Sequence, residues 1–212
     1  MNHIDTANLR RIALYFDPVC PWTYIVSKWL RNVNRLTGIP LEFRPFSLKM
    51  MNQGNEISEI NLQHFEAGLD LLRVVAELRE FPSELNRDLI SNLYNAFGIQ
   101  FHEEKVALPD LKIILDKHGI SNVVQTTQRL TNLDSQILLE MRHALTLAGE
   151  NVGVPIVVLE YESTSRGFFG PVLSHVPSGS DTLILWDHVI GLSAFECFVE
   201  IKRKRSGGAQ VI

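Results

Sequence analysis

The chain has 212 residues, of which 45% are hydrophobic, and a formal net charge of −4 at pH 7. This length and composition fit one globular domain with a sizeable core. The small negative charge makes nucleic acid and anionic membrane surfaces unexpected partners. The opening residues carry no apolar leader segment and no apolar run approaches the length of a membrane span, so we expect a cytoplasmic protein without a membrane partner.

The first part of the chain has the pattern of a strand, a helix and a second strand. An apolar run over residues 11–16 predicts the first strand, and apolar residues at three- and four-residue steps predict a helix over 21–37. Gly38 stands where a helix C-cap glycine belongs. Residues 41–46 alternate apolar and polar side chains, which predicts a second strand parallel to the first. Pro45 indicates that this strand lies towards an edge of the sheet.

The segment from about residue 56 to residue 149 has a helical pattern throughout. Two apolar stripes are separated by a break near Pro82. Asp110 is placed to open a short helix that Gly119 closes, and Asp134 is placed to cap a further helix. No linker rich in glycine, serine or proline marks the ends of this segment, so we expect it to belong to the same compact unit.

The second half returns to strands and then to helices. A buried strand is predicted over residues 153–159, with a proline near its start, and a short strand near 166–169 should pair with it across a turn. Two helical pieces follow, over 183–190 and 194–204, the second with the spacing of a capping box at its start.

The C-terminal tail carries a second cysteine and a basic run. Cys197 lies on the apolar face of the predicted last helix, so we expect a buried, inert thiol. Residues 202–205 are all basic and are interpreted as a solvated helix end that complements the helix dipole. The two cysteines have no zinc-type spacing, and a disulfide between them is not expected in a reducing compartment. The sequence shows neither a metal-ligand constellation nor a glycine-rich nucleotide loop.

Cys20 is the strongest candidate for chemistry, because it stands where a predicted strand ends and a helix begins. Pro21 follows it in the first helical turn, where a missing backbone N–H is tolerated. The free N–H groups and the positive dipole end of that helix favour a thiolate over a thiol. We therefore expect Cys20 to be a reactive nucleophile with a lowered pKa.

The turn Cys20-Pro21-Trp22-Thr23 resembles the active-site turn of the thioredoxin superfamily, specifically its DsbA-like branch. In that branch the motif is Cys-Pro-x-Cys. Here the fourth position is Thr23, so the resolving thiol of the family motif is missing. Every function that needs an internal disulfide is therefore disfavoured.

Further motifs resemble the actinobacterial branch that contains mycothiol-dependent nitroreductase-like proteins. They are Phe-Asp-Pro-x-Cys-Pro-Trp at 16–22, Gly-x-Pro at 153–155, Phe-Phe-Gly-Pro-Val-Leu-Ser at 168–174 and Leu-Trp-Asp at 185–187. The resemblance implies an α/β fold. A thioredoxin fold, made by about residues 11–50 and 151–205, would carry a DsbA-like all-helical insertion of about 56–149 within a single domain, 1–212.

The resemblance also implies the site residues. Val154 and Pro155 match the cis-proline loop that faces the active-site cysteine, while Asn52 and His102 match pocket positions of that branch. Cys20 and Thr23 would carry the catalysis, and substrate binding would fall to Pro21, Trp22, Asn52, His102, Val154 and Pro155.

Each of these residues also has a structural interpretation. Trp22 fits a core position as well as a substrate groove, and Thr23 fits a passive replacement of the lost cysteine as well as a hydroxyl donor to the thiolate. His102 is a lone histidine, for which a structural role is at least as good an interpretation as acid–base chemistry. Asn52 is equally open. Asp17 beside the thiol would raise the pKa of Cys20 and oppose its activation.

Two enzyme classes need only one activated cysteine. In the first, Cys20 adds reversibly to a conjugated alkene, which rotates before the thiolate leaves, giving cis/trans isomerisation without a cofactor. The DsbA-like branch contains such enzymes, among them 2-hydroxychromene-2-carboxylate isomerases, and the substrate would be a polyene or cinnamoyl-type acyl group, free or bound to a carrier protein. We favour this class narrowly.

In the second class, mycothiol or glutathione resolves Cys20, and the protein is a monothiol oxidoreductase or a nitroreductase-like enzyme. The resemblance favours this alternative, and the missing cysteine at position 23 weakens it. A third interpretation is a binding protein that kept the fold and lost the chemistry. The oligomeric state stays open.

Overall fold

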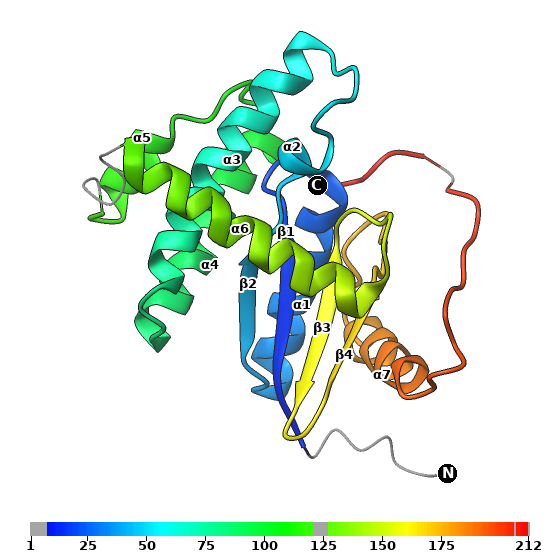
Figure 1. The fold of residues 1–212 in the computed structure, drawn as a ribbon. Coiled ribbons are helices and arrows are strands. Elements are labelled where there is room, and N and C mark those ends of the chain that lie inside the picture. The colour runs from blue at the N-terminus through cyan, green and yellow to red at the C-terminus, as the bar shows by residue number, and fades with distance from the viewer. Residues whose placement is uncertain (1–7, 121–126, 206, 212) are drawn as a thin grey trace.

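The computed structural model describes residues 8–120, 127–205 and 207–211, with side chains omitted over 127–131. A mixed four-stranded sheet lies at its centre, in the order β2-β1-β3-β4 (Figure 1). β2 (Leu41–Pro45) runs parallel to β1 (Leu9–Phe16), whereas β3 (Ile156–Tyr161) is antiparallel to β1 and to β4 (Ser165–Phe169). The predictions that the second strand is parallel to the first and lies at an edge are confirmed.

α1 (Pro21–Thr37) begins and ends where the local signals place it. Gly38 adopts φ +74° and its N–H donates to the Asn34 carbonyl at 2.8 Å, which closes the helix. The buried face of α1 packs against α7 (Asp181–Ser193) through Trp29, whose indole N–H donates to the Thr182 carbonyl at 3.1 Å. This pairing fixes the helix whose first turn carries Cys20.

The helices between β2 and β3 form the helical insertion. They are α2 (Leu48–Met51), α3 (Glu59–Arg79), α4 (Glu84–Gly98), the π-helix η1 (Ile99–Glu103), α5 (Leu111–Lys117) and α6 (Thr127–Ala148). In Figure 1, α6 crosses in front of the sheet, while α1 lies behind it. The fold is thus a thioredoxin fold with a helical insertion, as predicted. None of the described helices is long and apolar enough to span a membrane.

A charged network joins the helical insertion to the sheet. Arg44 of β2 pairs with Glu42 at 3.0 Å and with Glu160 of β3 at 2.5 Å. Arg79 of α3 pairs with Glu42 and, at 2.7 Å, with Glu140 of α6. Although burial raises the pKa of Glu42, Arg79 and Arg44 bring it down to about 2. The network fixes α3 and α6 on the sheet, so the insertion has a defined position against it.

Two sequence-based boundaries within the fold differ from the structure. The strand predicted over 153–159 begins only at Ile156, because the residues before it form the loop that approaches Cys20. Asp134 does not cap a helix, since α6 begins at Thr127 and Asp134 lies inside it. Its carboxylate accepts from Arg73 of α3 at 2.7 and 2.9 Å. Asp110, by contrast, caps α5 as predicted, accepting from the Ile113 N–H at 3.1 Å.

The predicted last helix is wrong. Residues 194–205 follow α7 without a further helix, and Ser193 donates to the Ile190 carbonyl at 2.7 Å rather than capping a new one. Cys197 is exposed, not buried. The apolar pattern is present, but no packed surface covers Val199 or Ile201, which are 91% and 80% exposed. Without tertiary packing, a short helix of moderate propensity is not stable.

Candidate active site

Cys20 occupies the N-cap position of α1, at the end of the turn that follows β1. Its backbone has φ −80° and ψ 111°, and its carbonyl accepts the Tyr24 N–H at 3.1 Å, which starts the helix. Pro21 is the first helical residue. The sulfur is buried, with 6% of the residue exposed, and the thiol donates to the Val154 carbonyl at 3.6 Å.

The Val154–Pro155 peptide is cis and lies directly before β3. Because β3 pairs with β1, the loop ahead of β3 meets the turn after β1 at the same edge of the sheet. The structure therefore brings Cys20 and Val154 together from positions 134 residues apart. This leaves the Val154 carbonyl as a backbone acceptor beside the sulfur.

Burial, rather than the helix terminus, dominates the pKa of Cys20. Removal from water raises the pKa of the thiol, and the charge of Asp17 raises it further. Hydrogen bonding to Thr23 and to the Trp22 N–H lowers it without overcoming burial. The expectation of a lowered pKa is thus wrong for this conformation: the helix terminus acts in the expected direction but is outweighed.

Thr23 lies in the first turn of α1 with its side chain fully buried. Its hydroxyl oxygen makes no hydrogen bond of full geometry within the described residues, yet it lies close enough to the sulfur to lower the pKa of Cys20. A buried hydroxyl without a partner is costly, and a thiolate at Cys20 would supply its acceptor. This arrangement suits stabilisation of the ionised sulfur.

Asp17 holds the turn in front of Cys20. Its carboxylate is fully buried and accepts the Val19 N–H at 3.0 Å and the Leu48 N–H of α2 at 2.7 Å. Burial raises the pKa of Asp17 to about 7, against the lowering effect of these two bonds. α3 passes close by at Gly68, where a Cβ would stand 3.0 Å from the Asp17 carboxylate. Asp17 therefore joins the turn to α2 while placing a titrating group beside the thiol.

His102 contacts the backbone of the turn rather than the sulfur. Its Nε2–H donates to the Pro18 carbonyl at 2.8 Å, and its ring stacks on Tyr24 with centroids 4.9 Å apart. Burial lowers the pKa of His102 to about 4, so the ring is neutral at pH 7. These contacts fit the structural interpretation of His102 better than acid–base chemistry.

His102 lies in the π-helix η1, whose neighbourhood is tightly packed against α1. Gly98, directly before η1, lies so close to Tyr24 that a Cβ would stand 2.2 Å from its ring. Tyr24 donates to Glu103 at 2.7 Å, and Lys28 donates to the same carboxylate at 2.7 Å. Sequence reasoning missed this cluster, since a π-helix has no pattern that distinguishes it from a continuing α-helix.

Asn52 and Trp22 lie at the edges of the site. Asn52 is the C-cap of α2, and its side chain donates to the Leu48 carbonyl at 2.8 Å. It reaches the turn indirectly, since the Leu48 N–H binds Asp17. Trp22 is partly buried, and the Arg205 guanidinium lies 4.6 Å from its ring centroid.

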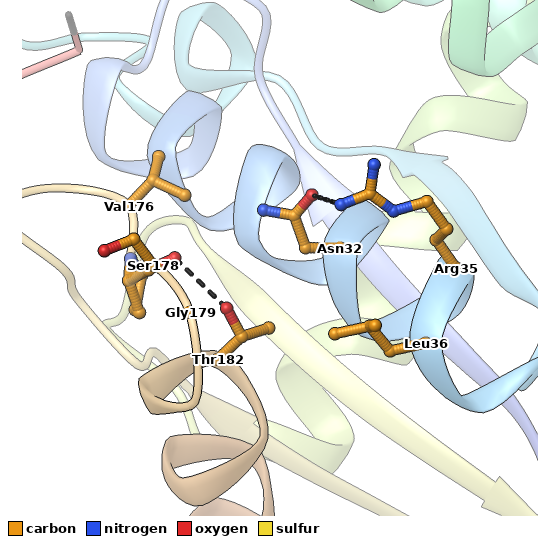
Figure 2. Close-up of a pocket in the computed structure, with 8 residues that line it drawn as sticks. Asn32, Arg35, Leu36, Val176, Ser178, Gly179 and Thr182 are labelled. Carbon is orange, nitrogen blue, oxygen red and sulfur yellow. Dashed lines mark hydrogen bonds between the residues drawn. The ribbon is translucent and has the colours of Figure 1, made fainter.

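A separate open depression lies towards the other end of α1 (Figure 2). Asn32 and Leu36 face the loop before α7, where Thr182 donates to the Pro177 carbonyl at 3.2 Å. Asn32 is twelve residues from Cys20, or roughly 18 Å along the helix axis. This depression therefore does not belong to the cysteine site. Within the described residues, no group of three or more His, Cys, Asp or Glu side chains is placed to hold a metal ion.

Comparison with known proteins gives a family and a fold. The model of the Rv2466c-like family, described as the mycothiol-dependent nitroreductase Rv2466c, matches residues 19–203. A relative from Mycobacterium tuberculosis (strain ATCC 25618 / H37Rv), the uncharacterized protein Rv2286c, is 28% identical over 198 residues, which are 92% of this chain and 82% of the relative.

Among solved structures, a Nitrosomonas europaea protein provisionally assigned as a protein disulfide isomerase superposes with a TM-score of 0.55 at 12% identity, over 84% of this chain and 98% of that one. This likeness supports the fold alone. A 2-hydroxychromene-2-carboxylate isomerase reaches a TM-score of 0.42 at 15% identity, over 85% of this chain and 94% of that one. That likeness is too distant to support isomerase activity.

Proposed function

Since the chain belongs to the Rv2466c-like family, whose model is that of a mycothiol-dependent nitroreductase, we propose that it is a single-cysteine oxidoreductase that uses mycothiol as its thiol co-substrate. The observation that carries the proposal is the geometry of one thiol. Cys20 stands at the N-terminus of α1 against the Val154 carbonyl, and the position of a resolving cysteine is held by Thr23. The resolving thiol must then come from outside the protein.

The proposed reaction is thiol–disulfide exchange. The Cys20 thiolate attacks the mycothiol sulfur of a mixed disulfide, so that a Cys20–mycothiol bond forms while the substrate leaves as a thiolate and takes up a proton. Attack by a second mycothiol on the mycothiol sulfur of this adduct releases Cys20 and forms the mycothiol disulfide. In sum, the mixed disulfide and one mycothiol become the substrate thiol and mycothiol disulfide: one disulfide bond is broken, one is formed, the incoming mycothiol is the reductant, and Cys20 returns to its starting state.

The residues around Cys20 suit this co-substrate. In the reduced protein the Val154 carbonyl accepts from the thiol. Once the sulfur is bonded to another sulfur it has no proton to donate, and the carbonyl is free to accept an amide N–H of the N-acetylcysteinyl part of mycothiol. The Thr23 hydroxyl stabilises Cys20 as the leaving thiolate in the second step.

Isomerisation by reversible addition needs the same thiolate, and the sequence alone favoured it. Family membership now favours thiol exchange, and no observation of the structure favours isomerisation over it. The use of glutathione, a carrier-bound substrate and a cytoplasmic location stay predictions.

The test is formation and release of a mixed disulfide. A Cys197→Ser protein, in which Cys20 is the only thiol, is incubated with mycothiol disulfide and analysed by intact mass spectrometry. We expect one mycothiol adduct, lost again on addition of reduced mycothiol, and none in the Cys20→Ser, Cys197→Ser control. A Cys20 that reacts with an alkylating agent but forms no adduct would overturn the proposal, and turnover of a conjugated alkene without added thiol would support the isomerase instead.

A further inference from the structure

The chain after α7 returns to the N-terminal half of α1. In Figure 1 the red C-terminal segment leaves α7, passes outside the other elements and ends near α1, where Lys28 contacts Val211. Residues 207–211, here called the C-terminal strap, lie beyond the range 19–203 that the family model matches. The match to the family therefore does not include the strap.

Two hydrogen bonds hold the strap in place. The Gln210 N–H donates to the Ser174 carbonyl, in the loop after β4, at 2.8 Å. Lys28 of α1 donates to the Val211 carbonyl at 3.4 Å while it pairs with Glu103 at 2.7 Å. The Val211 side chain is 7% exposed and packs with the core. The end of the strap thus contacts Lys28, which also pairs with Glu103, the residue after His102.

Arg205, just before the strap, covers an active-site side chain. Its guanidinium lies over the Trp22 ring at 4.6 Å, and Trp22 is only two residues from Cys20. Arg205 is otherwise exposed, as are residues 202–204. A cation over an indole face shields that face from other ligands. An incoming substrate that packs against Trp22 must therefore displace Arg205.

We propose that Arg205 and the C-terminal strap form a reversible cover on the active site, which must move before Cys20 can react with a bulky partner. Exchange needs a second sulfur to approach the Cys20 sulfur, but only 6% of Cys20 is exposed. Among the described residues, the cover is held by one cation–π contact, two hydrogen bonds and the apolar side chains of Ala209 and Val211, which is few enough for it to open without unfolding the sheet. The inference rests on a reactive Cys20 and not on the identity of the thiol.

The test compares the access of Cys20 with and without the cover. In a Cys197→Ser background, the chain is ended after Lys204, and the rate of alkylation is measured at fixed pH with small iodoacetamide and with a bulky maleimide. We expect the bulky maleimide to react about tenfold faster with the shortened chain than with the full-length chain, a change equivalent to about 1.4 kcal/mol. The small reagent should gain less, since it needs a smaller opening.

Point variants separate the cover from a general loss of structure. Arg205→Gln should speed the bulky reagent and raise the acrylamide quenching of Trp22, because Trp29 and Trp186 are buried and stay protected. Lys202→Gln removes the same charge from an exposed neighbour and should change neither. If the shortened chain does not fold, the same alkylation rates are measured on the Arg205→Gln and Val211→Asp variants instead.

Equal alkylation rates in folded Arg205→Gln, Val211→Asp and parent proteins would overturn the cover. This result is distinct from failure of the proposed function. Faster alkylation without a mycothiol adduct would support the cover and reject mycothiol as the co-substrate. A mycothiol adduct with unchanged alkylation rates would support mycothiol and reject the cover.

Discussion

Replacing Asp17 with asparagine removes a buried charge from the turn before Cys20 while keeping nearly the same shape. The carboxyl has its pKa raised by burial from 3.8 to about 7. Between these two values the unfolded chain loses the proton that the folded protein keeps, so the folded state becomes less stable as pH rises. A difference of about three pKa units corresponds to about 4 kcal/mol, which is fully lost above pH 7.

Urea unfolding at pH 4.5, 6, 7 and 8 measures this dependence. The parent protein should lose stability across the interval, and most of that slope should be absent from Asp17→Asn. The asparagine amide cannot accept from both the Val19 and Leu48 N–H groups, so the variant should start about 1 kcal/mol less stable at low pH. Glu162→Gln, which removes an exposed carboxylate paired with Arg10, is the matched control and should keep the parent slope.

The same substitution tests the influence of Asp17 on the thiol. Because the charge of Asp17 raises the pKa of Cys20, Asp17→Asn should move the pH profile of Cys20 alkylation to lower pH. A variant that keeps both the parent stability slope and the parent alkylation profile would refute the assignment of a raised pKa to Asp17.

Three further substitutions test the site. Thr23→Val should raise the pH at which Cys20 is alkylated and Thr23→Ser should restore it, since the hydroxyl is the part of this side chain that lowers the pKa of the thiol; equal profiles would reject that role. Thr23→Cys should release a bound mycothiol by forming an internal disulfide, seen by mass spectrometry, and a persistent adduct would mean that position 23 cannot reach Cys20. Gly98→Ala should cost about 1–3 kcal/mol in urea unfolding because its Cβ meets the Tyr24 ring, whereas Gly207→Ala, with open space around it, should be neutral; no loss in Gly98→Ala would contradict the close approach.

The parts of the fold that the sequence predicts well are those with local causes. α1 is bounded by Pro21 and by Gly38, whose φ of +74° suits a residue without a side chain. The cis-proline loop was found through family motifs. The last helix was predicted from a local pattern too, and it is wrong because helix formation there depends on a packing surface that Val199 does not have.

The properties of the candidate site are harder to predict because they depend on distant contacts. Cys20 has all the local features of an activated thiol, but its burial depends on Val154, which lies 134 residues away. Likewise, the pKa of Asp17 depends on burial under α3, which approaches at Gly68. A sequence pattern gives the sign of a local effect such as a helix dipole, but not the desolvation against which it acts.

The buried thiol and the need for a thiolate are compatible if exposure and ionisation occur together. Burial is the largest influence that raises the pKa of Cys20, whereas the Thr23 hydroxyl and the N–H groups of Trp22 and Thr23 belong to the first turn of α1 and stay in place when the cover opens. On the proposal that the cover contributes to this burial, opening lessens the main cause of the raised pKa and retains the groups that lower it. Cys20 would be an inert thiol while covered and a nucleophile once a partner displaces Arg205 from Trp22.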